Sequence, residues 1–239
     1  NSRLAAMGIP VSCEVDIYGA LSEYIGVCVS GAPTTLLDIN NTVPASIYDK
    51  AIRGRYDVRL PETFMGFRRK DGRAAIRNEI WIIPTVGCVN DIAKKMVADN
   101  QDLVTGSIEG LYTFTHPFGC SQTGHDHAQT RKLLAALVRH PNAAAVLVLS
   151  LGCENLTHEQ FLTELGEYDH DRIKFLTCQD VDDELVAGRE ILKELAAYAA
   201  QFQREPIPSS ELVVGMKCGG SDGLSGITAN PTIGRFSDM

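Results

Sequence analysis

The chain has 239 residues, of which 44% are hydrophobic and 22% are charged, as is typical of soluble globular proteins. No apolar run approaches the roughly 20 residues that a membrane span needs, so we expect no membrane segment. The formal net charge of -8 argues against a nucleic-acid-binding surface, and the short Arg68-Arg69-Lys70 cluster does not change that. Because the chain starts at Asn1 and stops at Met239 without a closing element, we expect a fragment of a longer protein.

The first sixty residues predict a small α/β segment. Residues 9–17 read as a strand, residues 18–29 as an apolar helix and residues 34–39 as a second strand. Glu14 and Asp38 lie near the ends of these strands, where two carboxylates could share a divalent cation. The alternative is that each carboxylate is satisfied by a helix terminus or by water.

From Arg77 onward, apolar strand patterns alternate with amphipathic helix patterns. Such alternation predicts an α/β fold, a doubly wound three-layer domain with a parallel sheet, over residues 62–239. Pro206 and Pro208 are expected to break the chain before a last strand. The expected strands are residues 80–83, 111–115, 144–151, 173–177 and 212–215, and the expected helices are residues 91–99, 126–140, 158–165 and 182–202.

Four of the seven cysteines stand directly after apolar runs and beside glycine: Cys88, Cys120, Cys153 and Cys218. If these runs are parallel strands, the four thiols gather at one sheet edge, where open α/β folds bind ligands. The alternative is that each is a small buried hydrophobic residue. Disulfides are disfavoured by the odd cysteine count and the lack of a secretory signal, so we expect a reduced, cytoplasmic compartment.

Residues 1–67 contain the motifs Cys13-Glu14-Val15-Asp16-Ile17-Tyr18-Gly19-Ala20 and Leu37-Asp38-Ile39-Asn40-Asn41. Through these motifs the segment resembles a piece of the L-fucose and L-arabinose isomerase family. It implies that Glu14 and Asp38 bind Mn2+ and serve proton transfer between aldose and ketose. The third metal ligand of that family, a histidine, has no counterpart here.

Residues 62–239 contain a series of motifs: Thr63-Phe64-Met65-Gly66-Phe67-Arg68-Arg69, Gly72-Arg73-Ala74-Ala75-Ile76-Arg77-Asn78, His116-Pro117-Phe118-Gly119-Cys120-Ser121-Gln122, Leu151-Gly152-Cys153-Glu154-Asn155 and the run from Cys218 to Pro231. Through these motifs the segment resembles the altronate and galactarate dehydratase family, with variants closer to altronate dehydratase. The two resemblances meet at Thr63-Phe64-Met65-Gly66-Phe67, as a natural fusion, a recombinant or a misjoined sequence would. We therefore place the domain boundary between residues 61 and 62.

The dehydratase resemblance implies that water is removed from a sugar acid to give a 2-keto-3-deoxy acid, with ferrous iron. Such chemistry needs a base beside the carboxylate and a cation for the enediolate charge. The expected iron ligands are the four strand-end cysteines and His116, since iron accepts thiolate and imidazole. The same thiolates could instead hold an iron–sulfur cluster.

Further site residues follow the same motifs. His125 and His127, at a helix start, could serve as acid or base, although such histidines are more often solvated. Arg77 and Asn78 could pair with the substrate carboxylate, or serve a capping or interdomain role. The glycine-rich run could present N–H groups to a carboxylate or be a tight turn, and its candidate residues are Gly219, Gly220, Ser221 and Asp222.

Three functions stay open at this point: a sugar-acid hydro-lyase, a metal-dependent sugar isomerase fragment, and an inactive fragment. The expected partner is a small sugar acid, with no nucleic acid or membrane. Homo-oligomerisation is left open.

Overall fold

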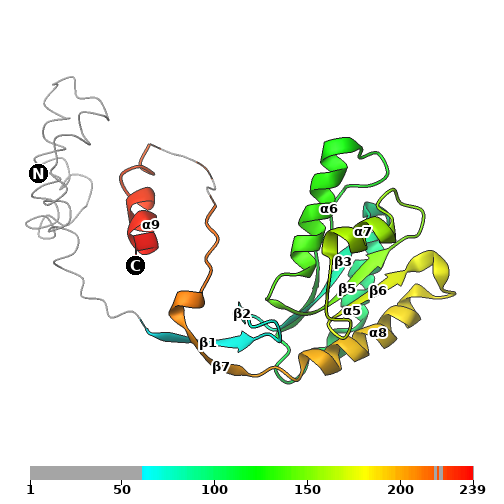
Figure 1. Cartoon of the computed structure of the whole chain (residues 1–239), viewed down its shortest axis with the longest axis horizontal. Coiled ribbons are helices and arrows are strands. Elements are labelled where there is room, and N and C mark those ends of the chain that lie inside the picture. The colour runs from blue at the N-terminus through cyan, green and yellow to red at the C-terminus, as the bar shows by residue number, and fades with distance from the viewer. Residues whose placement is uncertain (1–60, 218–219, 221–222, 239) are drawn as a thin grey trace, which may run out of the picture. The chain divides into compact units, whose positions relative to one another are not determined.

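The computed structural model describes residues 61–217, 220 and 223–238. Within it, Pro61–Gly234 forms one compact unit (Figure 1). The elements expected in the first sixty residues, the Glu14 and Asp38 pair and residues 1–60 of the isomerase resemblance lie outside the described residues. No helix in the described part of the chain has the length and apolarity needed to cross a membrane.

A parallel sheet lies at the centre of this unit. Its strands are β3 (Glu79–Pro84), β4 (Gly110–Thr113), β5 (Ala143–Ser150) and β6 (Ile173–Thr177), in the order β4-β3-β5-β6. Every neighbouring pair is parallel. Strand β5 is buried over seven of its eight residues, which explains its near-continuous apolar sequence.

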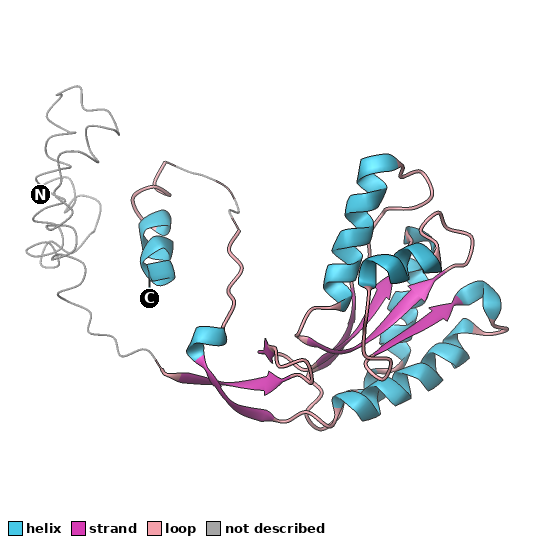
Figure 2. Ribbon diagram, in the orientation of Figure 1, coloured by secondary structure: helices cyan, strands magenta, loops and turns pink. Residues whose placement is uncertain are grey.

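Helices cover both faces of the sheet (Figure 2). On one face, α5 (Asn90–Asp99) and α8 (Glu184–Ala199) pack Met96 and Leu195 against Ile82 of β3. On the other, α6 (Gly124–Val138) and α7 (His158–Leu165) pack Val138 and Phe161 around Ile83. Burying each such side chain stabilises the fold by roughly 1.5–3 kcal/mol. The predicted α/β, three-layer, doubly wound architecture is confirmed.

A second, antiparallel sheet consists of β2 (Ala74–Ala75), β1 (Thr63–Arg68) and β7 (Arg204–Pro208), in that order. The prediction that Pro206 and Pro208 break the chain was wrong, because both lie within β7, where Pro206 pairs with Met65. Since β7 is an edge strand, its prolines need not donate to a further neighbour.

The strand predicted over residues 212–215 was also wrong. Residues 212–217 form no regular element and are exposed, with Val213 at 92% exposure. The apolar run 212–214 pairs with no strand of the described residues, so its β propensity is not realised.

The remaining elements are short or were not expected. Four 3-10 turns occur in the described residues: η2 (Gly87–Val89), η3 (Gln101–Leu103), η4 (Cys178–Asp180) and η5 (Ser209–Glu211). A C-terminal helix, α9 (Ala229–Asp238), was not predicted. Two helix starts carry side-chain caps, because Thr157 forms a capping box with Gln160 and Asp183 accepts from the N–H groups of Leu185 and Val186.

Candidate active site at the carboxyl edge of the sheet

The winding of the chain reverses at the carboxyl edge of the parallel sheet. After β3 the chain crosses to β4 on one side, and it then returns to β5 on the other side of β3. The loops that follow β3 and β5 therefore diverge, and this reversal point is where open α/β sheets bind ligands. Cys88 follows β3, Cys120 follows β4 and Cys153 follows β5, and all three thiols are exposed.

The loops after β3 and β4 are in direct contact. The N–H of Gly87 donates to the carbonyl of Phe118 at 2.7 Å, and the Asn90 side chain donates to the carbonyl of His116 at 2.8 Å. A Cβ at position 87 would lie 3.0 Å from the carbonyl oxygen of His116 and 3.1 Å from that of Phe118. Only glycine permits this approach without displacing a neighbour, so the loop that leads to Cys120 is fixed against the turn that carries Cys88.

His116 is held by both ring nitrogens. Its Nε2 lies 3.0 Å from the carbonyl oxygen of Pro84, and its Nδ1 accepts from the N–H of Phe118 at 3.3 Å. Because a carbonyl can only accept, this arrangement assigns the proton to Nε2. In this position the imidazole fixes the loop, and a metal could be bound only after one of these contacts is exchanged.

Glu154 connects the loop after β5 to β3. Its carboxylate is buried and accepts from the Thr85 hydroxyl at 2.7 Å, from the Leu151 N–H at 3.2 Å and from the Gly152 N–H at 2.6 Å. Hydrogen bonds to a buried carboxylate are charge-assisted and strong. The Glu154 carboxylate therefore ties the loop after β5 to the segment after β3, a role that the sequence analysis did not assign to it.

The start of α6 completes this edge. The Asn155 side chain donates to the carbonyl of Gln122 at 2.7 Å, which ties the β5 loop to the segment before α6. Both His125 and His127 lie in the first turn of α6, where His125 is exposed and His127 is half-buried.

Three buried polar atoms among the described residues have no hydrogen-bond partner: Asn90 Oδ1, Thr113 Oγ1 and His127 Nε2. All three belong to segments at the carboxyl edge, at the start of α5, the end of β4 and the start of α6. Buried polar groups are nearly always hydrogen-bonded, so a concentration of exceptions is typical of a functional site.

The described thiols differ in environment. Cys178, which the sequence analysis did not select, is buried at the same edge, and burial, followed by the nearby Glu184 and Glu154 carboxylates, raises the pKa of its thiol to about 11. Cys178 is therefore a neutral thiol near pH 7, unlike a metal-binding thiolate.

The described residues do not by themselves build the expected iron site. No three histidine, cysteine or acidic side chains in this part of the chain are grouped as a metal ion requires. Cys218 lies outside the described residues, as do Gly219, Ser221 and Asp222, whereas Gly220 is described and exposed. The predicted ligand set therefore stays a prediction.

Arg77 and Asn78 lie at the opposite, amino edge of the sheet. Asn78 is fully buried, and its side chain donates to the carbonyls of Ser107 and Ala199 and accepts from Arg69. Arg77 is exposed and lies 3.9 Å from the carboxylates of Glu79 and Glu109. The structure thus does not bring this pair together with the cysteine-bearing loops, and the contacts of Asn78 are those of a structural residue.

The sequence matches two family models in the same order as the motifs. Residues 66–200 match the model described as "D-galactarate dehydratase/Altronate hydrolase, second domain", and residues 209–239 match "D-galactarate/Altronate dehydratase, C-terminal". The chain belongs to the galactarate dehydratase and altronate hydrolase family. The first match contains the loops of Cys88, Cys120 and Cys153.

Curated relatives agree with this assignment. The chain is 52% identical to altronate dehydratase of Bacillus subtilis (strain 168) over 181 residues, which cover 74% of this chain and 36% of that protein. It is 52% identical to altronate dehydratase of Escherichia coli (strain K12) over 176 residues, covering 72% and 35%. A more distant relative, the (2R)-sulfolactate sulfo-lyase subunit beta of Chromohalobacter salexigens, is 34% identical over 177 residues, covering 74% and 43%. The chain spans about a third of the length of the two altronate dehydratases.

Proposed function

We propose that this chain carries part of the active site of a hydro-lyase that removes water from altronate, or a closely similar sugar acid, to give a 2-keto-3-deoxy acid. The observation that carries the proposal is the 52% identity to two altronate dehydratases. The matched family region includes the three loops at the reversal point of the sheet, where a ligand crevice is expected.

The residue types at the carboxyl edge suit this chemistry. Dehydration requires a base to remove the proton next to the carboxylate and an acid to protonate the departing hydroxyl. His125 and His127 supply imidazoles at the start of α6. Asn90 Oδ1 is an acceptor without a protein partner in the described residues, and Thr113 Oγ1 can accept as well as donate. The hydroxyl groups of a sugar acid would provide donors of the kind that these atoms need.

The relatives' names point to one class of reaction. Altronate dehydratase removes water, whereas sulfolactate sulfo-lyase is named for a lyase reaction at a sulfonated lactate. Both substrates are hydroxy acids. A shared site would therefore bind the carboxylate end of the substrate, while the leaving group differs between the relatives.

Ferrous iron is part of the same proposal. It would supply a Lewis acid for the charge that develops next to the carboxylate. The residues that would bind the iron at the described carboxyl edge are Cys88, Cys120 and Cys153. His116 could join them after its ring gives up one of its two hydrogen bonds. Cys218, outside the described residues, would be a further ligand. An iron–sulfur cluster on the same thiolates is the alternative form.

An assay of product formation tests this proposal. The chain is purified without oxygen, supplied with ferrous iron and mixed with altronate, and the 2-keto-3-deoxy acid is measured with bound iron and acid-labile sulfide. We expect bound iron and altronate binding, and loss of bound iron in Cys153→Ala; product from this chain alone would place the whole active site within it. The matched control is Cys178→Ala, which removes a buried neutral thiol at the same edge and should keep its iron.

The outcomes separate the two parts of the proposal. Iron without sulfide supports a mononuclear site, and iron with sulfide supports a cluster. Binding of altronate without turnover would keep the substrate class but place the chemistry outside this chain. Neither binding nor turnover, with a folded chain and bound metal, would refute the proposal.

A further inference from the structure

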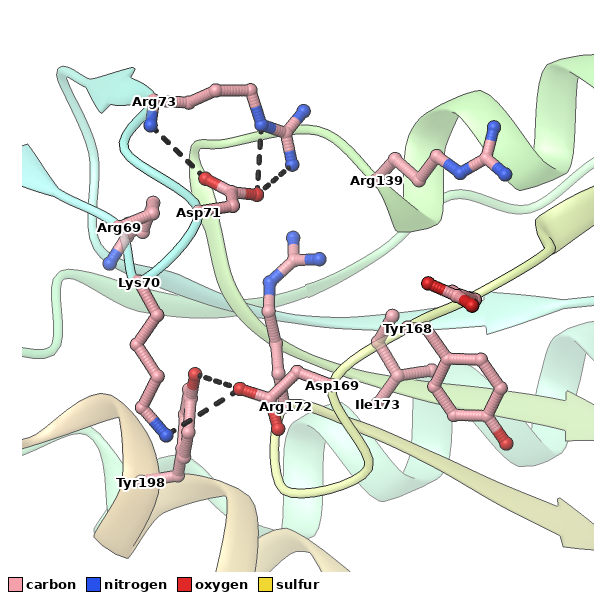
Figure 3. A pocket seen from close by; sticks show the side chains of 11 residues that line it. Arg69, Lys70, Asp71, Arg73, Arg139, Tyr168, Asp169, Arg172, Ile173 and Tyr198 are labelled. Atoms are coloured by element: carbon pink, nitrogen blue, oxygen red, sulfur yellow. Dashed lines mark hydrogen bonds and ion pairs between the residues drawn. The ribbon is translucent and has the colours of Figure 1, made fainter.

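A basic cavity lies at the amino edge of the parallel sheet, away from the cysteine-bearing loops. Its volume is about 470 Å3, within the roughly 300–1,000 Å3 range of small-molecule sites. The walls come from the turn before β2, the segments that precede β5 and β6, and the end of α8 (Figure 3). Five basic side chains line it: Arg69, Lys70, Arg73, Arg139 and Arg172.

The acidic side chains of the cavity are fewer and mostly engaged. Asp71 holds Arg73 through two hydrogen bonds of 2.7 and 3.0 Å to one carboxylate oxygen. Asp169 accepts from the Tyr198 hydroxyl at 2.7 Å and pairs with Lys70 at 3.5 Å. With Glu167, three acids face five bases, which leaves an excess of two positive charges in a chain whose formal net charge is -8.

Three of the arginines have no carboxylate partner within the described residues. Arg69 donates to the carbonyls of Pro141 and Arg77 and to the Asn78 side chain. Arg139 donates from Nη2 to the carbonyls at the end of α7. These contacts hold the guanidinium groups in place but do not neutralise their charges.

Arg172 is the most informative of the three. It is only 9% exposed, and its Nε and Nη2 donate to the carbonyls of His140 and Ala143 at 2.8–3.3 Å. Its Nη1 makes no hydrogen bond to any part of the chain that the structure describes. In Figure 3 its guanidinium extends toward the Asp71 and Arg73 pair, and Nη1 is its nitrogen with unused N–H groups among the described residues.

The charges in this cavity repel one another. Burial, followed by the charge of Arg172, lowers the pKa of Arg69 to about 10. Burial and the charge of Arg73 likewise lower the pKa of Arg172. Burial is the larger cause of both shifts, and nearby carboxylates such as Asp71 offset it only in part.

We propose that this amino-edge cavity, which Arg172 and Arg139 both line, binds a small oxyanion, a phosphate or a carboxylate. The N–H groups of Arg172 Nη1 are unused among the described residues, and an oxyanion accepts charge-assisted hydrogen bonds from such a group. The site is separate from the proposed sugar-acid crevice, because its lining segments lie at the opposite ends of the strands. It therefore does not depend on the proposed dehydratase activity.

Calorimetric titration tests this proposal with two probes, inorganic phosphate and malonate, at constant ionic strength set with chloride. The variants are Arg139→Gln and Arg172→Lys, which remove a charge and the forked geometry respectively. The matched control is Arg189→Gln, because Arg189 pairs with Asp102 and does not line the cavity. Circular dichroism and thermal unfolding establish that each variant is folded.

We expect at least one anion to bind the wild-type chain and Arg189→Gln at one site, and to bind Arg139→Gln and Arg172→Lys about tenfold or more weakly. Binding of phosphate alone assigns a phosphate ligand, and binding of malonate alone assigns a carboxylate. No binding of either anion, or equal affinity in all four proteins, would overturn the proposal. If Arg172→Lys does not fold, the affinity of Arg139→Gln tests the proposal instead. Arg139 is exposed, so its replacement should leave the fold intact.

Discussion

Replacing Glu154 with glutamine tests whether this carboxylate holds the segments after β3 and β5 together. An amide oxygen can still accept from Gly152 N–H, and the new NH2 group can donate to the Thr85 hydroxyl. The NH2 group would then face the N–H of Leu151, which loses its acceptor. One unsatisfied buried donor costs about 1–3 kcal/mol, and the remaining bonds lose their charge assistance. We expect Glu154→Gln to lower the free energy of unfolding by about 2–3 kcal/mol in total.

Unfolding in urea, followed by tryptophan fluorescence, measures this cost. Trp81 is the single tryptophan of the chain and is 5% exposed in β3, so its emission reports on the parallel sheet. A loss of about 2–3 kcal/mol corresponds to roughly 4–12 °C in Tm for a unit of this size. The control is Glu190→Gln, an exposed residue paired with Lys193, which should change stability by less than about 0.5 kcal/mol. Equal effects of the two substitutions would refute the reasoning.

Three further substitutions have defined expectations. Gly87→Ala should lower the free energy of unfolding by about 1–3 kcal/mol, because its Cβ would lie 3.0–3.1 Å from the carbonyl oxygens of His116 and Phe118. Hydrogen exchange should become faster in the loop that contains these two residues, and an unchanged exchange rate there would contradict the expectation. Asp183→Ala removes the N-cap of α8 and should cost about 1 kcal/mol in urea unfolding, whereas a neutral effect would mean that packing alone fixes the helix start. Tyr198→Phe should cost about 1–2 kcal/mol at pH 7. Burial would raise the pKa of Asp169, but the Tyr198 hydroxyl, backbone N–H groups and Lys70 lower it below its ordinary value. The stability that comes from the lowered pKa of Asp169 is present at neutral pH and is lost as the pH falls through the folded-state pKa of that carboxyl. The destabilisation caused by Tyr198→Phe should therefore become smaller in acid. A destabilisation that does not change with pH would contradict the hydrogen bond between Tyr198 and Asp169.

The parallel sheet could be predicted from the sequence because its strands are buried on both faces. The continuous apolar run of β5 and the periodic apolar positions of α5 and α7 give strong local signals. The small sheet was missed for the opposite reason. β7 contains two prolines and is mostly exposed, so only its pairing with β1 makes it a strand.

The gathering of three cysteine loops at one edge also followed from the sequence, since parallel strands end at the same edge. The role of Glu154 did not, because it depends on two backbone N–H groups and a threonine that come together only after β3 and β5 pair. Arg77 and Asn78 were selected by a motif. The contacts of Asn78 are structural, and they depend on segments more than twenty residues away.

The basic cavity at the amino edge had no sequence signal. Arg69, Arg139 and Arg172 are far apart along the chain and belong to three different segments. Each alone reads as a solvated arginine. Their shared lack of carboxylate partners is visible only in the folded unit.

Hydrogen–deuterium exchange of the iron-loaded chain, with and without altronate, tests the central claim most directly. The account predicts slower exchange in the loops after β3, β4 and β5, which carry Cys88, Cys120 and Cys153, with no change at the amino-edge cavity. Protection confined to the amino edge, with the three loops unchanged, would contradict it.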